Sequence, residues 1–238
     1  MNIKLCFYLS LFIIAGCYIG EDKNTDQLTM DANTRKNLNL LNHLKTDDLN
    51  DFLWMNEPPH YTIENGTLRM RAPEKSDFFV DPESKKSTGN APLLYKMVSG
   101  DFVASALIKP NFDDIWNAGA MMVYIDSTHW IKFAFENSDA TGKSIVTVVT
   151  KGVSDDANGV MLHTEDRIWL RIVRKGNAYS MHWSKDGIDY KMARLSTLPY
   201  AEKVKLGLEA QCPAGGPAPH EFEYFSLEHR TVENIREG

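Results

Sequence analysis

WIKFAFE, residues 130–136, decides the fold class, because its side chains alternate between two kinds of surface. Ile131, Phe133 and Phe135 are apolar and occupy every second position. Successive side chains of a β-strand point to opposite faces, so this spacing predicts a strand with one face turned to a core. The opposite face of that strand carries Trp130, Lys132, Ala134 and Glu136.

Short segments of the same kind occur on both sides of residues 130–136. They lie at 67–71, 102–108, 120–125, 145–150, 168–173, 179–183, 190–195, 204–210 and 222–227. Turn sequences separate them, such as Lys185-Asp186-Gly187, whose Asp-Gly pair suits a tight hairpin. About a dozen short strands with almost no helix between them predict an antiparallel sandwich or barrel. A chain of 238 residues can form such a structure as one domain.

The composition excludes some classes of partner. Apolar residues make up 43% of the chain and charged residues 24%, which is ordinary for a globular protein. The formal net charge is −6, so we expect no nucleic-acid partner, because nucleic-acid-binding domains carry basic patches. The same charge gives no general attraction to anionic lipid headgroups.

The N-terminal sequence predicts a signal that directs the protein to a membrane. One lysine, Lys4, precedes an apolar run of about eleven residues, which is shorter than the about twenty needed to span a bilayer. Ile14-Ala15-Gly16-Cys17 then resembles the bacterial lipobox. We therefore predict a lipoprotein signal peptide at residues 1–16, lipidation of Cys17, and a protein anchored by lipid in the bacterial cell envelope, at the outer membrane or cell surface. The alternative is an ordinary signal peptide with a chance cysteine.

The rest of the chain divides into three predicted segments. Residues 17–48 form a polar tether and a short helical segment, 49–230 form the sandwich, and 231–238 form a C-terminal tail. Leucines at spacings of three to five within residues 31–51 indicate the helix. Cys212 has no partner once Cys17 is lipidated, so we expect no disulfide and a small, partly buried thiol.

Several motifs together resemble a known family. They are Asp77-Phe78-Phe79, Gly100-Asp101-Phe102, the run 118–123 that leads to Asp126 and Trp130-Ile131-Lys132, and the run 144–150 before Ser154-Asp155. Over residues 49–229 the chain resembles the domain-of-unknown-function 1349 family, also labelled regulation-of-enolase-like, of the concanavalin A-like lectin/glucanase superfamily. It is also similar to the C-terminal sandwich module of some β-xylosidases.

The resemblance implies an all-β jelly-roll β-sandwich of two antiparallel sheets with one concave face, and no established activity. Two positions depart from the family pattern. Tyr124 stands where an arginine is expected, and no tryptophan follows Ser154-Asp155. If these positions line a groove, the ligand differs from that of typical members or binding is lost.

The polar face of residues 130–136 is the candidate ligand-binding site. Trp130 offers a flat surface for a sugar ring, and Lys132 and Glu136 offer hydrogen bonds to hydroxyl groups. The alternative is a tryptophan at the sheet edge beside an exposed Lys–Glu pair, which contributes only about 0–1 kcal/mol. Further candidates come from the family motifs and the strand order, and they are Asp77, Phe79, Tyr124, Thr147 and Asp155. For Asp77 and Phe79 the alternative is a turn cap and a core aromatic.

The function predicted from these features is a non-catalytic module that binds an oligosaccharide or polysaccharide at the cell envelope. The alternative is a glycoside hydrolase, which needs two carboxylates about 5–10 Å apart. Glu136 and Glu209 form such a pair only if the fold brings them together, and the superfamily's E-x-D-x-x-E pattern is absent. A third hypothesis is an envelope protein whose sandwich face meets another protein. We therefore predict no catalytic residue.

No cofactor or metal is predicted. The 7 histidines do not cluster at the spacing of zinc ligands, and no glycine-rich phosphate loop occurs. Asp81, Glu83 and Asn90 have the oxygen ligands that calcium prefers, but nothing in their spacing fixes a coordination geometry.

Overall fold

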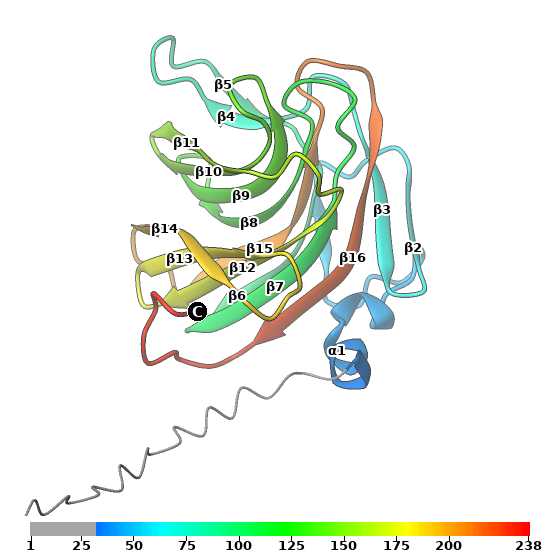
Figure 1. The fold of residues 1–238 in the computed structure, drawn as a ribbon, viewed down its shortest axis with the longest axis vertical. Coiled ribbons are helices and arrows are strands. Elements are labelled where there is room, and N and C mark those ends of the chain that lie inside the picture. The colour runs from blue at the N-terminus through cyan, green and yellow to red at the C-terminus, as the bar shows by residue number, and fades with distance from the viewer. Residues whose placement is uncertain (1–31) are drawn as a thin grey trace, which may run out of the picture.

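The computed structural model describes residues 32–238, which form a sandwich of two seven-stranded antiparallel sheets and one additional hairpin (Figure 1). The all-β sandwich that the sequence predicts is confirmed. The predicted signal peptide at 1–16, the lipidation site Cys17 and the first part of the tether lie outside the described residues.

The first sheet has seven strands, which are, in spatial order, β1 (Leu53–Met55), β6 (Leu93–Ser99), β15 (Lys203–Gln211), β8 (Ala118–Asp126), β9 (His129–Ser138), β10 (Gly142–Lys151) and β11 (Val153–Met161). The second sheet has the order β14 (Lys191–Thr197), β13 (Ala178–Ser184), β12 (Ile168–Lys175), β7 (Phe102–Lys109), β16 (Ala218–Glu228), β3 (Thr67–Ala72) and β2 (Tyr61–Glu64). The hairpin pairs β4 (Phe78–Val80) with β5 (Ser87–Gly89).

The main core lies between the two sheets. Ile131, Phe133 and Phe135 of β9 point into it and are fully buried, as their alternation predicts. Gly119 of β8 also faces this core, where an added Cβ would lie 2.6 Å from Cγ2 of Ile108 on the second sheet. The sheets therefore approach so closely at this point that only glycine fits.

A second apolar cluster lies on the outer face of the first sheet. This face is concave, and the hairpin β4–β5 lies over part of it (Figure 1). Phe78 of β4 packs edge-on against Trp130, with ring centroids 6.1 Å apart. The exposed fraction of Trp130 is consequently only 2%, so our expectation of an open indole surface is wrong. Residue alternation places Trp130 on the predicted face, but the hairpin covers it.

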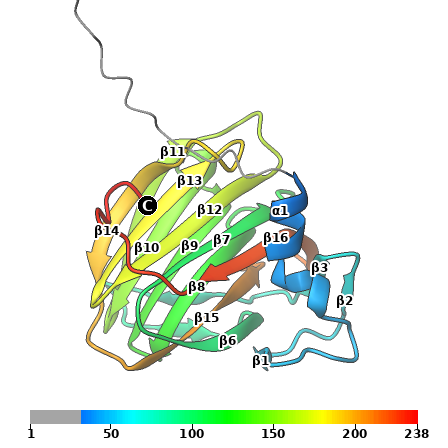
Figure 2. The ribbon, with the colours of Figure 1, turned by 90° about the horizontal axis from the view of Figure 1, so that it is seen from below.

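The segments on either side of residues 49–230 pack onto the sandwich. Helix α1 (Ala32–Leu38) and the 3₁₀ helix η1 (Leu40–His43) lie beside β16, and Leu41 and Leu44 are buried in the main core (Figure 2). The C-terminal segment crosses the outer face of the second sheet, where Val232 packs against Val103 and Val173. Within the described residues, no helix is long and apolar enough to cross a membrane.

Asn39 joins the N-terminal helices to the second sheet. Its side-chain nitrogen donates to the carbonyl oxygens of Gly66 and Glu223 at 2.9 and 3.3 Å. Its side-chain oxygen accepts from the backbone N–H groups of Leu41 and Phe225 at 3.2 and 3.0 Å. Asn39 is 6% exposed, so water cannot replace these bonds.

We predict that Asn39→Ala lowers the free energy of unfolding by about 1–3 kcal/mol, because it leaves buried polar groups without partners. Urea unfolding followed by circular dichroism measures the change. Asn42→Ala is the matched control, because Asn42 lies in η1, which Asn39 caps, but is exposed, and it should change stability by less than about 0.5 kcal/mol. Equal effects of the two substitutions would contradict the role of Asn39.

Candidate functional site

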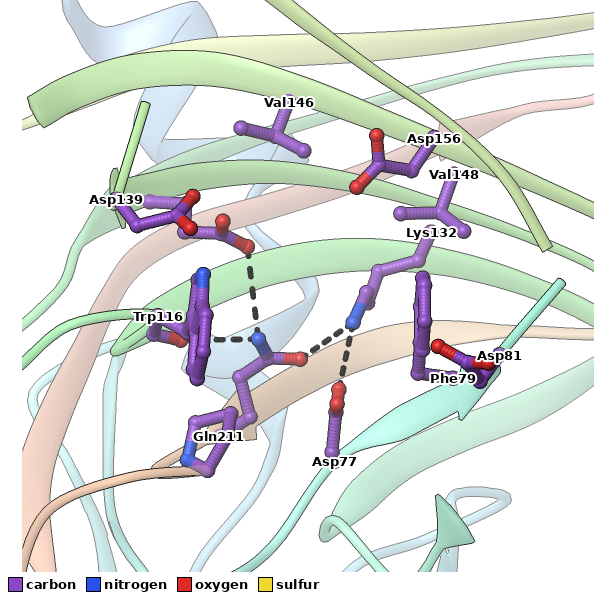
Figure 3. Close-up of a pocket in the computed structure, with 12 residues that line it drawn as sticks. Asp77, Phe79, Asp81, Trp116, Lys132, Asp139, Val146, Val148, Asp156 and Gln211 are labelled. Carbon is purple, nitrogen blue, oxygen red and sulfur yellow. Dashed lines mark hydrogen bonds and ion pairs between the residues drawn. The ribbon is translucent and has the colours of Figure 1, made fainter. Parts of the chain in front are cut away.

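A cavity of about 360 Å³ opens on the concave face of the first sheet, beside the hairpin β4–β5 (Figure 3). The residues that line it are Asp77, Phe79, Asp81, Trp116, Lys132, Glu136, Asp139, Val146, Val148, Asp156, Gln211 and Pro213. The floor comes from β9, β10 and β15, and the walls come from the hairpin, β11 and the loop before β8.

Strand register brings polar side chains together on this face. Ala118 of β8 lies between Gln211 of β15 and Glu136 of β9, since it pairs with both. Ala120 in turn pairs with Glu209 of β15. Both alanines are buried and small, so the longer side chains of β15 and β9 can converge above β8. The result is a polar cluster on an otherwise apolar sheet.

Lys132 is the centre of this cluster. Its side chain is 3% exposed, and its Nζ donates to Oδ1 of Asp77 at 2.8 Å. Nζ also donates to the carbonyl oxygen of Phe78 at 2.9 Å and to Oε1 of Gln211 at 2.6 Å. An ammonium has three N–H donors, and all of them are used. Two of these bonds go to the hairpin, so Lys132 fastens the hairpin to the sheet.

Burial and charge set the protonation of the cluster. Burial opposes the charged form of Lys132, but the carboxyl groups of Asp77, Glu209 and Glu136 outweigh it and raise the pKa of Lys132. Burial raises the pKa of Glu136 to about 8 and that of Glu209 to about 8, although Lys132 acts in the opposite direction on both. At neutral pH both glutamates are therefore mainly uncharged acids, and Lys132 keeps its charge.

Gln211 connects the cluster to the rim of the cavity. Its Nε2 donates to the carbonyl oxygen of Trp116 at 2.9 Å and lies 3.5 Å from Oε2 of Glu136. With Oε1 on Lys132, these contacts fix the orientation of the amide. Trp116 has a φ of +64°, a strained backbone conformation for a bulky residue, and its side chain is 41% exposed. The strained backbone holds the indole at the cavity mouth.

The structure brings together four of the residues that the sequence predicts for the site. Asp77, Phe79, Lys132 and Glu136 all line the cavity. Trp130 does not, because the hairpin buries it.

Tyr124 packs edge-on against Phe78 with ring centroids 6.0 Å apart, and Nζ of Lys205 lies 5.0 Å from the centroid of its ring. It is outside the set of residues that line the cavity, so the structure does not place it in the site.

Thr147 and Asp155 are also outside the cavity. Arg194 of the second sheet contacts both, with Nη1 at 3.3 Å from Oγ1 of Thr147 and Nη2 at 2.7 Å from Oδ2 of Asp155. The reason is strand alternation, because Val148 and Asp156, the next residue in each strand, point into the cavity. The predicted strands are right, but these two side chains are on the opposite face.

Sequence reasoning missed Gln211, Trp116, Asp139 and Asp156. A signal for Gln211 exists, since Glu209 and Gln211 are polar residues two apart at the end of an apolar strand. Trp116 lies in a loop, where no periodicity assigns a direction to its side chain.

The calcium ligands considered from the sequence hold turns instead. Oδ1 of Asp81 accepts from the backbone N–H groups of Glu83 and Ser84, and Asn90 bonds to the backbone of Asp77 and Lys75. In residues 32–238 no group of three or more histidine, cysteine, aspartate and glutamate side chains is arranged to hold a metal ion.

Cys212 is a buried free thiol, and burial raises its pKa to about 11.

Residues 54–230 match the family described as protein of unknown function (DUF1349). The chain belongs to this family. It is 25% identical over 183 residues to Regulation of enolase protein 1 of Saccharomyces cerevisiae, which covers 77% of this chain and 92% of the yeast protein. A crystal structure of a functionally unknown protein from Saccharomyces cerevisiae has a TM-score of 0.72 and 24% identity, over 76% of this chain and 98% of that one.

More distant structures share the fold alone. Xylan beta-1,4-xylosidase from Bacillus halodurans matches with a TM-score of 0.59 and 14% identity, over 72% of this chain and 35% of the enzyme. The exoplasmic/lumenal domain of VIP36 matches with a TM-score of 0.51 and 8% identity, over 80% of this chain and 89% of that domain. The resemblance to lectin-like sandwiches seen in the sequence is thus confirmed at the level of the fold.

We predict that Glu209 contributes stability that is lost as pH rises from about 4.5 to about 8, so that Glu209→Gln loses less stability than the wild type over this range. Glu209 has a pKa of about 8 in the folded state against 4.5 ordinarily, so the folded state binds more protons across that window. Stability contributed by such a group is lost as pH rises. Glutamine resembles the protonated acid and does not titrate.

Thermal unfolding at pH 5, 6, 7 and 8 measures this dependence, and the variant should lose less stability than the wild type toward pH 8. Glu202→Gln, at an exposed position before β15, is the control and should follow the wild type. Parallel pH profiles of wild type and Glu209→Gln would contradict the assignment.

Proposed function

We propose that the cavity binds a carbohydrate. The observation that carries the proposal is the combination of two aromatic walls with oriented polar groups between them. In Figure 3 the rings of Trp116 and Phe79 stand on opposite sides of the Lys132 ammonium and the Gln211 amide. A sugar ring has C–H faces that pack on aromatic rings and hydroxyl groups that need hydrogen bonds. The two rings supply the first, and the carboxyl group of Glu136, which Lys132 and Gln211 leave free to bond further, supplies the second.

The volume of the cavity agrees with a small ligand. Its 360 Å³ lies within the range of about 300–1,000 Å³ that is usual for small-molecule sites. The hairpin β4–β5 covers the part of the concave face that contains Trp130. A short oligosaccharide segment therefore fits the open part, whereas a long polysaccharide cannot lie along the whole sheet.

The VIP36 domain supports the proposal, since its structure is a Ca2+/Man3GlcNAc-bound form. At 8% identity the likeness concerns the fold, so the argument for this chain rests on its own cavity. The side chains that would meet the sugar are Trp116, Phe79, Gln211 and Glu136.

Glycoside hydrolysis is less well supported. A pKa of about 8 suits Glu136 as a proton donor, but hydrolysis needs a second carboxylate across the bond. Glu209 is 0% exposed and outside the residues that line the cavity, and Asp77 is engaged by Lys132. Asp139 and Asp156 also line the cavity, but both are exposed to water rather than enclosed across from Glu136. The geometry therefore favours binding over catalysis.

We also propose that lipid on Cys17 holds the protein at the bacterial envelope. The proposal is supported by the lipobox-like Ile14-Ala15-Gly16-Cys17. Helix α1 packs beside β16 of the second sheet, whereas the cavity lies on the outer face of the first sheet.

We predict that Trp116→Ala weakens carbohydrate binding by about tenfold or more, which corresponds to about 1.4 kcal/mol, because it removes one aromatic wall. A glycan array identifies the oligosaccharides that bind, and isothermal titration calorimetry gives the affinities. Tyr200→Ala is the control, because Tyr200 is 73% exposed and is not among the residues that line the cavity. Unchanged affinity in Trp116→Ala, or no glycan bound by the wild type, would overturn the proposal.

We predict that Cys17→Ser moves the protein out of the membrane fraction of an expressing Gram-negative bacterium and abolishes labelling with radioactive palmitate. The reason is that the thiol is the acceptor of the lipid, and acyl chains supply about 0.8 kcal/mol of membrane affinity for each buried methylene. Cys6→Ser, within the same apolar segment, should behave as the wild type. Palmitate incorporated into the Cys17→Ser protein would exclude this site.

A further inference from the structure

The cavity is strongly acidic. Its lining includes five carboxyl groups, from Asp77, Asp81, Asp139, Asp156 and Glu136, and a single ammonium, from Lys132. Lys132 is already paired with Asp77 at 2.8 Å, so its charge is compensated within the protein. The remaining carboxyl groups surround the space between Trp116 and Phe79.

Two of these carboxylates have no hydrogen-bond or ion-pair partner in the described part of the chain. Asp139 lies between β9 and β10, and Asp156 lies on β11. Within residues 32–238, neither side chain makes a hydrogen bond or an ion pair, whereas Asp81 accepts two bonds from backbone N–H groups of its own turn. Figure 3 shows Asp139 and Asp156 on the same side of the cavity, above Trp116 and Lys132. Both are therefore available to a ligand.

A third group, Glu136, is buried and only partly satisfied. It is 6% exposed and lines the cavity. Its Oε2 lies 3.5 Å from Nε2 of Gln211, at the limit of hydrogen bonding. Its carboxyl group therefore keeps hydrogen-bonding capacity for a ligand in the cavity.

The electrostatics of Asp156 favour a cationic ligand. Burial raises the pKa of Asp156 and Lys132 lowers it, while the neighbouring carboxylates of Asp139 and Asp155 raise it further and Arg194 lowers it. A positive charge placed near Asp156 and Asp139 would relieve both the repulsion and the loss of hydration.

We propose that the cavity selects a carbohydrate that carries a free amine, an amino sugar whose ammonium lies between Asp139 and Asp156. The proposal rests on the carbohydrate-binding function proposed above and names the chemistry of its ligand. The sugar ring packs between Trp116 and Phe79, where an ammonium also gains from the electron-rich faces of the rings. A bare divalent cation fits less well, because aromatic walls supply no oxygen ligands and no metal-ligand group is found within residues 32–238.

Three tetrasaccharides with the same β-1,4 linkage test the proposal on the purified full-length chain in detergent: the glucosamine, the N-acetylglucosamine and the glucose oligomer. They differ only at carbon 2, which bears an amine, an acetamide or a hydroxyl group, and in mildly acidic buffer the amine is protonated to an ammonium. Calorimetry should show the glucosamine oligomer binding about tenfold or more tightly than the other two. Raising the salt from about 0.05 to about 0.5 M should weaken only that binding, because screening acts on the ammonium.

The outcomes separate the two proposals. Equal affinities, or preference for a neutral oligomer, overturn the amine preference and leave carbohydrate binding standing. If none of the three binds while another neutral glycan of the array does, the amine preference again fails alone. If nothing binds at all, both proposals fail.

Substitutions locate the charge. Asp139→Asn and Asp156→Asn should each weaken binding of the glucosamine oligomer by about fivefold, and by more than they weaken binding of any neutral glycan. Asp189→Asn, at an exposed position in the β13–β14 turn, is the charge-matched control and should leave binding of the glucosamine oligomer unchanged. Full amine binding by the two cavity variants, with unfolding temperatures like the wild type, would overturn the placement of the ammonium.

Discussion

The ion pair between Lys132 and Asp77 is the interaction on which the rest of the site depends. A buried ammonium is tolerated only when its donors are satisfied, and here a carboxylate, a carbonyl oxygen and an amide oxygen satisfy all three. Two of those partners, at Asp77 and Phe78, belong to the segment that forms the hairpin β4–β5. The Lys132 ammonium on the sheet therefore also holds this hairpin in place. Gln211, oriented by Lys132, then fixes the carbonyl oxygen of Trp116. The first sheet, the hairpin β4–β5 and the loop that carries Trp116 are thereby connected through Lys132.

Much of this could be predicted from local sequence. The period-two pattern of residues 130–136 places Ile131 and Phe135 in the core and Lys132 and Glu136 on the other face, and the structure has them there. Such patterns are local, because successive strand residues must alternate. The family motifs supplied Asp77 and Phe79, which the alternation of β9 alone does not place.

What could not be predicted depends on contacts between distant segments. Trp130 is on the expected face, yet Phe78, fifty-two positions earlier in the chain, closes over it. The predictions for Thr147 and Asp155 missed the cavity by one residue, since in each strand the next side chain points into the cavity. Trp116 belongs to a loop whose left-handed backbone has no periodic signature. Three features depend on the assembled fold: a hairpin that packs over a sheet, the backbone conformation of a loop, and the choice of which strand face lines a cavity.

The hairpin has a consequence for access. A curved sheet that is open from edge to edge forms a trough, which admits a guest lying lengthwise. With β4–β5 seated on one part of it, fastened by Lys132 and lined by Phe78 against Trp130, the trough becomes a recess with one closed end. Whatever enters therefore meets the buried polar groups of this recess and cannot lie along the whole sheet.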